Sequence, residues 1–289
     1  MKSSLLTGLV FTVLWSSAST ATKIGLLVGQ PFIICIARFF FAGICMLLIT
    51  HIFMKNDLPR GSQWKQLAIY GLMNVSLYLG IYILAMQYVS PGLGSLSTAT
   101  APVIISLITA LFLRKPLRGN TLISLFLCMA GVLLAAYPLF NSNHASPAGL
   151  ALLMVSMIIY SCGTLYYSRI NWAGMHILTI NGWQTLLGGL FLLPVALFTY
   201  RQEANTWNIQ LLGSIVWLAI PVSIVAIQLW LMLLRENPLK ASFWLFLAPL
   251  SGLLIANLVM KEPISVYTIV GMAMVIGGLF ILQWKRTIA

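Results

Sequence analysis

Two stretches of sequence, WSSASTATKI at 15–24 and YSCGTLYYSRI at 160–170, decide the fold because they match each other with a single insertion. The match extends along the chain when the sequence is shifted by 145–147 residues, and its order never breaks. The matched positions are Val75 with Val222, Ser76 with Ser223, Pro91 with Pro238, Ser95 with Ser242, Ala101 with Ala248, Pro102 with Pro249, Pro116 with Pro263 and Gly131 with Gly278. The chain is therefore an internal duplication.

Both copies consist of long apolar runs joined by short connectors. A helix needs about 20 apolar residues to cross the hydrocarbon core of a membrane. The runs predict ten such helices, at about 4–28, 31–53, 65–88, 92–113, 119–139, 147–168, 176–200, 210–234, 239–261 and 264–284. They are continuously apolar, unlike the alternating pattern of a membrane-spanning strand. We predict an all-α integral membrane protein with ten transmembrane helices.

The composition supports the same class of protein. Of the 289 residues, 60% are hydrophobic and only 7% are charged, whereas a soluble domain carries about 25% charged residues. This excludes a soluble enzyme, a disordered protein and a nucleic-acid binder. The net charge of +12 does not change that conclusion, because the basic residues lie between apolar blocks and form no contiguous basic face.

Each copy holds five predicted helices, so the second copy must enter the membrane with the opposite orientation. We divide the chain into a first repeat at 1–140 and an inverted second repeat at 141–289. Inverted repeats related by an axis in the membrane plane are the architecture of many secondary transporters. Two similar halves that exchange conformations give inward-open and outward-open states of comparable stability.

Basic residues in the connectors predict the orientation. With a cytoplasmic N-terminus, the inside receives Lys2, Lys55, Arg60, Lys65, Arg114, Lys115, Arg118, Arg169, Arg235, Lys240, Lys285 and Arg286, and the outside receives Lys23, Arg201 and Lys261. The positive-inside rule therefore predicts that both termini are cytoplasmic. The N-terminal segment also has features of a signal peptide, but the same segment recurs inside the chain, where a signal could not act.

Four segments carry a family resemblance. They are the first predicted helix, with Trp15, Ser16 and Ser17 and an end at Lys23; PFIICIARFFFAG at 31–43; SLSTATAPV at 95–103; and SFWLFLAPL at 242–250, which runs on to Lys261, Glu262 and Pro263. With the two five-helix halves, they resemble the EamA type of the drug/metabolite transporter superfamily over nearly the whole chain. The resemblance implies an inner-membrane carrier, often an exporter of amino acids, other metabolites or toxic amphiphiles. The first half departs from the pattern, since Arg114, Lys115 and Pro116 stand where the second half has Glu262.

Arg38 is the one charged side chain well inside a predicted span. It lies about 10 Å along its helix from Pro31, at 1.5 Å per residue. An arginine near the bilayer centre costs about 2.5–3.5 kcal/mol on insertion scales, so it should face a wet cavity or a partner. The alternatives are a substrate contact, or a structural hydrogen bond or snorkelling to the interface. Its matched residue is Gln184, which is polar but neutral.

Helical spacing predicts a polar stripe on the third span, where Asn74, Tyr78 and Tyr82 follow at i, i+4 and i+8. We expect this stripe to contact the substrate, with helix packing as the alternative. The eighth span shows a similar stripe, formed by Trp217, Pro221, Ile224 and Gln228 at i, i+4, i+7 and i+11. The small hydroxyl residues of the first span are expected to serve close helix packing.

These observations predict an aromatic, weakly polar cavity between the repeats. Its expected lining is Arg38, Asn74, Tyr78, Tyr82, Trp183, Gln184, Gln228 and Trp244. Rings supply apolar contact and amides fix orientation, which suits amino acids and small amphiphiles.

Pro102 and Pro249 lie midway along matched spans and are the predicted hinges. Each should remove an internal hydrogen bond and free a carbonyl four residues earlier, at Thr98 and Leu245. The alternative is a static kink.

The sequence lacks the residue patterns typical of a proton relay, of ATP binding, of a metal site and of an enzyme active site. Asp57, Glu203, Glu236 and Glu262 all map to connectors or span ends, which disfavours a proton relay through buried acids. The chain has no phosphate-binding Gly-Lys-Ser/Thr loop, no metal-ligand spacing among its histidines, and no constellation that suits an enzyme. Its four cysteines are expected to be reduced. We therefore expect no cofactor and no metal.

The sequence predicts an inner-membrane secondary transporter that exports amino acids or small amphipathic metabolites by alternating access. The alternatives are a multidrug or toxic-compound efflux carrier, or a channel. The expected partners are a small-molecule substrate and the lipid bilayer, with no nucleic acid. We expect a monomer or a weak homodimer.

Overall fold

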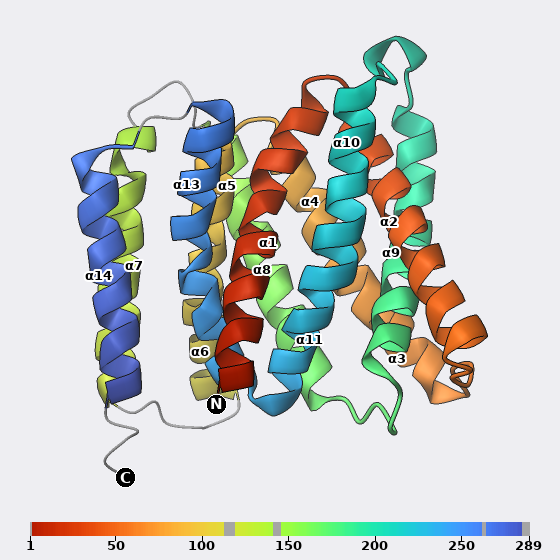
Figure 1. Ribbon diagram of the computed structural model, residues 1–289, viewed down its shortest axis with the longest axis horizontal. Helices are drawn as coiled ribbons and strands as arrows, with labels where there is room; N and C mark the ends of the chain where they lie inside the picture. Colours follow the sequence, from red (N-terminus) through yellow and green to blue (C-terminus); the bar gives the residue numbers. More distant parts are fainter. Residues whose placement is uncertain (1, 113–118, 141–145, 262–263, 285–289) are drawn as a thin grey trace.

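The computed structural model describes residues 2–112, 119–140, 146–261 and 264–284. Several residues used above lie outside these ranges, namely Arg114, Lys115, Pro116, Arg118, Glu262, Pro263, Lys285 and Arg286. The described parts of the chain form helices joined by short connectors (Figure 1).

The helical elements of the first half are α1 (Lys2–Leu26), α2 (Pro31–Leu47), η1 (Leu48–Phe53), α3 (Ser62–Gly71), η2 (Leu72–Leu77), α4 (Tyr78–Ala85), α5 (Pro91–Ser97), η3 (Thr98–Thr100), α6 (Ala101–Phe112) and α7 (Gly119–Phe140). Those of the second half are α8 (Pro147–Arg169), α9 (Ile177–Thr199), η4 (Gln202–Ala204), α10 (Ile209–Trp217), η5 (Leu218–Ala226), α11 (Ile227–Glu236), α12 (Pro238–Ser242), η6 (Phe243–Phe246), α13 (Ala248–Met260) and α14 (Val266–Trp284).

Consecutive elements join into the membrane-crossing helices that the sequence predicts. Within the described ranges, eight continuous helices are long and apolar enough to cross a membrane. Two shorter apolar helices, Gly119–Ala135 and Val266–Gly278, occupy the places of the fifth and tenth predicted spans. The predicted ten-helix, all-α membrane fold is confirmed.

The duplication extends to irregularities of the backbone. The third span of the first half contains the π-helical segment η2, and the matched span of the second half contains the π-helical segment η5. The fourth span contains the 3₁₀ segment η3, and its counterpart contains the 3₁₀ segment η6. Such segments often mark functional or strained places in helices. Here they interrupt two spans of each half at corresponding positions.

The two halves run through the molecule in opposite directions. In Figure 1, α1 begins at the lower end and α8 begins at the upper end. The start of α8 is tied there by the backbone N–H of Ser146, which donates to the carbonyl of Tyr88 at 3.2 Å. The last helix, α14, ends at the lower end, where α1 starts.

The halves are interleaved rather than separate. α1 packs against α13, α2 against α9, α4 against α8, and α7 against α14, so each of these pairs joins the two halves. The α7–α14 pair lies at the left edge of the molecule in Figure 1. Gly131 and Gly271 let its backbones approach closely, because a Cβ atom on either glycine would meet the carbonyl oxygen of the other. Small residues commonly allow such contact between membrane helices.

Hydrogen bonds join connectors of the two halves at the upper end. The side-chain amide of Gln30 donates to the carbonyl of Thr199 at 2.7 Å, and its oxygen accepts from Asn205 Nδ2 at 2.8 Å and from the backbone N–H of Arg201 at 2.8 Å. The backbone N–H of Thr206 donates to the carbonyl of Val28 at 2.8 Å. The upper connectors are therefore held together.

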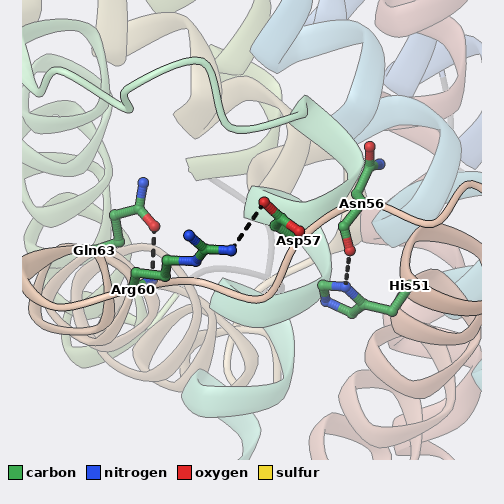
Figure 2. Close-up of polar contacts among 5 residues, drawn as sticks. All are labelled: His51, Asn56, Asp57, Arg60 and Gln63. Atoms are coloured by element: carbon green, nitrogen blue, oxygen red, sulfur yellow. Dashed lines mark hydrogen bonds and ion pairs between the residues drawn. The ribbon is translucent and has the colours of Figure 1, made fainter.

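Two connectors at the lower end border a pocket. Figure 2 shows polar contacts of the 54–61 connector with itself and with the adjoining helices: Arg60 pairs with Asp57 at 3.2 Å, and Gln63 Oε1 accepts from the backbone N–H of Arg60 at 2.7 Å. His51 Nδ1 lies 2.9 Å from the carbonyl of Asn56. A polar pocket of about 390 Å³ separates this connector from residues 173–176.

Candidate functional site

A small cavity lies in the interior of the helix bundle. Its walls come from α1, α2, α4, α5, η3 and η5, and the residues that line it are Trp15, Ser16, Ala18, Ser19, Thr22, Arg38, Tyr78, Leu79, Tyr82, Ser95, Thr98 and Val222. Its volume of about 20 Å³ is room for about one water molecule. In this conformation the helices are closed around the cavity.

Arg38 places a buried positive charge at this cavity. It comes from the middle of α2, is 5% exposed, and donates from Nε to Ser223 Oγ of η5 at 2.7 Å. Among the described residues this is the only hydrogen bond of the guanidinium group. The ring of Phe39 lies 5.2 Å from Cζ. Arg38 thus lies beside a cavity and also has a hydrogen-bond partner in the other half.

A chain of buried amides continues from Ser223 across the interface between the halves. Asn181 Nδ2 donates to the carbonyl of Ser223 at 3.0 Å, and Asn181 Oδ1 accepts from Gln184 Nε2 at 3.1 Å. Gln184 Oε1 then accepts from Asn74 Nδ2 at 3.1 Å. Asn74 and Gln184 are thus brought together, but they bond to each other and do not line the cavity. Buried polar networks of this kind fix a unique arrangement of the helices that carry them.

Tyr78 and Tyr82 both face the cavity, as their helical spacing predicts, with ring centroids 6.1 Å apart. Asn74 leaves this stripe because it lies in the π-helical segment η2. A π-helical turn contains an extra residue, which shifts every side chain before it relative to an α-helical pattern. The third-span stripe therefore holds for the two tyrosines and fails for Asn74.

The cavity adjoins a contact between matched residues of the two halves. Trp15 and Tyr160 are the first residues of the repeated segments, and their ring centroids lie 6.0 Å apart. Tyr160 also packs against Tyr78 at 4.8 Å and against Trp230 at 6.1 Å. Phe11 stacks on Trp230 at 5.0 Å and completes a layer of buried rings. This aromatic layer, made of Phe11, Trp15, Tyr160 and Trp230, meets the cavity at Trp15 and continues along α1 toward its start at Phe11.

Three other predicted site residues lie away from the cavity. Trp183 donates from Nε1 to His51 Nε2 at 3.0 Å and packs edge-on against Trp64 at 4.6 Å, near the lower connectors. The indole of Trp244 packs on Gly8 of α1. Gln228 is partly buried, and its Oε1 has no hydrogen-bond partner in the described part of the chain.

The matched prolines lie inside continuous spans, each at the second residue of the α-helical part that follows a 3₁₀ segment. Pro102 is the second residue of α6 and follows η3, and Pro249 is the second residue of α13 and follows η6. The expectation that Thr98 has a free carbonyl is wrong, because the backbone N–H of Ala101 bonds to it in a 3₁₀ turn. The tighter turn satisfies the group that proline leaves without its usual donor.

Residues of the first span belong to the cavity although spacing did not single them out for it. Their small hydroxyl side chains predict close helix packing, but Ser16 and Ser19 line the cavity with Thr22. Ser95 also lines it and donates to the carbonyl of Ala248 in the other half at 3.1 Å. A run of small hydroxyl residues fits both roles, so only the neighbours of the helix distinguish them.

Among the described residues, no group of three or more His, Cys, Asp or Glu side chains is arranged to hold a metal ion. Cys35, Cys45, Cys128 and Cys162 are all free thiols. The described residues of the cavity offer one cation, hydroxyl groups and aromatic rings.

Comparison with known proteins agrees with this architecture. The model of the EamA-like transporter family matches the chain twice, over residues 2–137 and 147–284. An uncharacterized transporter of Archaeoglobus fulgidus is 27% identical over 276 residues, covering 94% of this chain and 95% of its own. Protein PecM of Dickeya dadantii is 29% identical over 271 residues, covering 93% of this chain and 88% of its own.

A crystal structure with 18% sequence identity superposes on the whole chain with a TM-score of 0.76 and is itself fully covered, which shows a common fold. The family model matches each half of the chain separately, as expected for a duplicated sequence. The Archaeoglobus fulgidus relative is named a transporter. The chain belongs to the EamA-like transporter family and is a multi-pass membrane transporter.

Proposed function

We propose that this chain is a secondary carrier of the inner membrane that exports amino acids or small amphipathic metabolites by alternating access. The observation that carries the proposal is the closed cavity beside the Trp15–Tyr160 contact, where matched segments of the two halves meet. A site near the axis between inverted repeats can open to either side when the halves exchange conformations. The repeats 1–140 and 141–289 are the units that exchange.

The chemistry of the cavity supports this substrate class. Tyr78, Tyr82 and Trp15 provide apolar ring surface, and Ser16, Ser19 and other hydroxyl residues provide hydrogen-bonding groups. Binding sites for small metabolites combine an apolar lining with a few placed polar groups in this way. Because the cavity holds about one water molecule when closed, the helices must move apart to admit a substrate.

The distribution of basic residues supports cytoplasmic termini. The lower end of the molecule carries Lys2, Lys55, Arg60, Lys65, Arg169, Arg235 and Lys240, and the upper end carries Lys23, Arg201 and Lys261. The positive-inside rule assigns the more basic end to the cytoplasm. On this orientation the aromatic layer lies on the cytoplasmic side of the cavity, and the Gln30–Asn205 contacts lie on the outer side.

Counterflow in liposomes tests the carrier. The purified protein is reconstituted into vesicles loaded with an unlabelled amino acid, and uptake of the same labelled amino acid is followed across a panel. We expect saturable exchange for at least one member, weakened by Tyr78→Ala and unaffected by Tyr137→Ala, because Tyr137 is exposed on α7 and packs against Tyr267. Unsaturable flux with single-channel currents would replace the carrier with a channel.

A groove on the surface favours efflux of toxic amphiphiles as a second candidate function. It has a volume of about 310 Å³, lies between α1, α10 and α13, and is almost entirely apolar. Trp217 borders it and donates from Nε1 to Ser17 Oγ at 2.9 Å. Protein-dependent loss of a neutral amphiphilic dye from vesicles, without amino-acid exchange, would favour this candidate over the first.

A further inference from the structure

Arg38 carries a charge that the described protein does not neutralise. The only ion pair in the described chain joins Arg60 to Asp57 in the lower connector. Glu203 and Glu236 are exposed at the ends of the molecule. No described carboxylate therefore lines the cavity or contacts the guanidinium group. A buried charge without a counter-ion is costly in a membrane interior and usually marks a functional group.

Two phenol groups at the same cavity also lack hydrogen-bond partners among the described residues. Tyr78 and Tyr82 line it beside Arg38, and neither hydroxyl group makes a hydrogen bond to a described residue. The terminal nitrogens of Arg38 lack such bonds as well, since its one bond comes from Nε. Hydrogen-bond donors of α2 and α4 that have no acceptor among the described residues thus gather at one cavity. A guanidinium group binds a carboxylate through two parallel hydrogen bonds.

We propose that the substrate brings the missing negative charge as a carboxylate, which binds Arg38 and the hydroxyl groups of Tyr78 and Tyr82 when the cavity opens. This inference rests on the carrier function proposed above and specifies its substrate class. Among the described residues, a single guanidinium group lines the cavity, so it neutralises one negative charge, which suits a carboxylate better than a phosphate monoester dianion. The planar fork of arginine also matches the planar carboxylate.

The proposal is tested by binding to the purified full-length protein, with its tryptophan fluorescence as the readout because Trp15 lines the cavity. The probes are matched pairs that differ in charge but hardly in size: 4-methylpentanoate and its amide, 3-phenylpropanoate and its amide, and L-leucine and L-leucinamide. We expect at least one carboxylate to bind about 10-fold or more tightly than its amide. Equal binding of every acid and its amide, or no binding by any acid, would overturn the proposal.

Variants of the protein test whether Arg38 causes acids to bind more tightly than their amides. Arg38→Gln should reduce the acid-to-amide ratio to near one, and Arg38→Lys should keep part of it because the charge remains. Arg235→Gln is the matched control: Arg235 donates to Tyr167 Oη at 3.2 Å and to the carbonyl of Met175 at 2.6 Å, away from the cavity. A ratio that survives Arg38→Gln would contradict the proposal.

Two further variants keep the test valid if Arg38→Gln does not fold. Ser223→Ala removes the only hydrogen-bond partner that the guanidinium group has among the described residues, so the preference should be kept or increased. Tyr82→Phe removes a donor and should weaken binding of the acid more than binding of the amide. A lost preference for the acid in Ser223→Ala, together with unchanged binding of the acid in Tyr82→Phe, would contradict the proposed carboxylate site.

Transport separates this proposal from the proposed carrier function. Exchange of an amide as fast as its acid in vesicles would leave the carrier intact and refute the carboxylate site. Arg38-dependent binding of a carboxylate by a protein that exchanges no member of the panel would support the site and refute the carrier.

Discussion

The contact between α7 and α14 gives a sharp test of the packing. A Cβ atom on Gly271 would meet the carbonyl oxygen of Gly131, and it would lie 2.8 Å from the backbone nitrogen of Ala135 and 2.9 Å from its Cβ atom. Backbone atoms cannot rotate away as a flexible side chain does. Replacing Gly271 with alanine should therefore push the two helices apart.

Gly277 on the same helix provides the matched control. The nearest atom to a Cβ at that position is Leu127 Cδ2 at 3.8 Å, an ordinary van der Waals contact. Both glycine-to-alanine changes gain the same intrinsic helix propensity, about 1 kcal/mol in water. Only Gly271→Ala also carries an overpacking cost of about 1–3 kcal/mol. Gly271→Ala should thus be less stable than Gly277→Ala by about 1–3 kcal/mol.

Thermal unfolding in detergent measures this difference with a thiol-reactive dye. Cys35 and Cys128 are both buried, so they react when the helices separate or unfold. Cys128 lies directly at the contact, with its Sγ 3.5 Å from the carbonyl of Val275. We expect earlier labelling and a lower midpoint for Gly271→Ala than for Gly277→Ala. Equal midpoints for the two variants would refute the close approach of α7 and α14.

Other contacts give further predictions. Ser95→Ala removes the hydrogen bond to Ala248 that joins the halves and should lower the free energy of unfolding by about 0.5–1.5 kcal/mol. Gln30→Ala should loosen the upper connectors and raise their amide hydrogen exchange on the order of 10-fold. Pro102→Ala should slow transport without removing the folded protein, as expected of a hinge. Exchange should be faster than net efflux in wild type, because an empty cavity leaves Arg38 without a counter-ion.

Each of these expectations has an outcome that contradicts it. Unchanged stability of Ser95→Ala would mean that its hydrogen bond is replaced by another. Unchanged exchange at 27–30 and 200–208 in Gln30→Ala would show that the upper connectors are held by other contacts. Transport at the wild-type rate in Pro102→Ala would make the proline a static feature. Net efflux as fast as exchange would show that the empty carrier reorients freely.

The sequence determined the number, type and approximate bounds of the helices. Apolar runs long enough to cross a membrane have little choice of structure, since every backbone polar group must be bonded within the segment. The repeated positions determined the opposed directions of the two halves, because five spans per copy reverse the entry side. The tyrosines at positions 78 and 82 could be assigned to one face, since the helix between them is α-helical.

The tertiary structure decided which polar residues share a cavity. The sequence predicts that Asn74 and Gln184 contact a ligand. In the structure their side chains hydrogen-bond to each other from different halves of the chain. The π-helical segment η2 turned Asn74 off its predicted stripe, and single-sequence periodicity has no signal for such a segment. Ser16 and Ser19 reached the cavity because α4 and α5 lie opposite them, a pairing that spacing along one helix does not contain. Spacing along the chain fixes the face of a helix, whereas packing between helices fixes what that face meets.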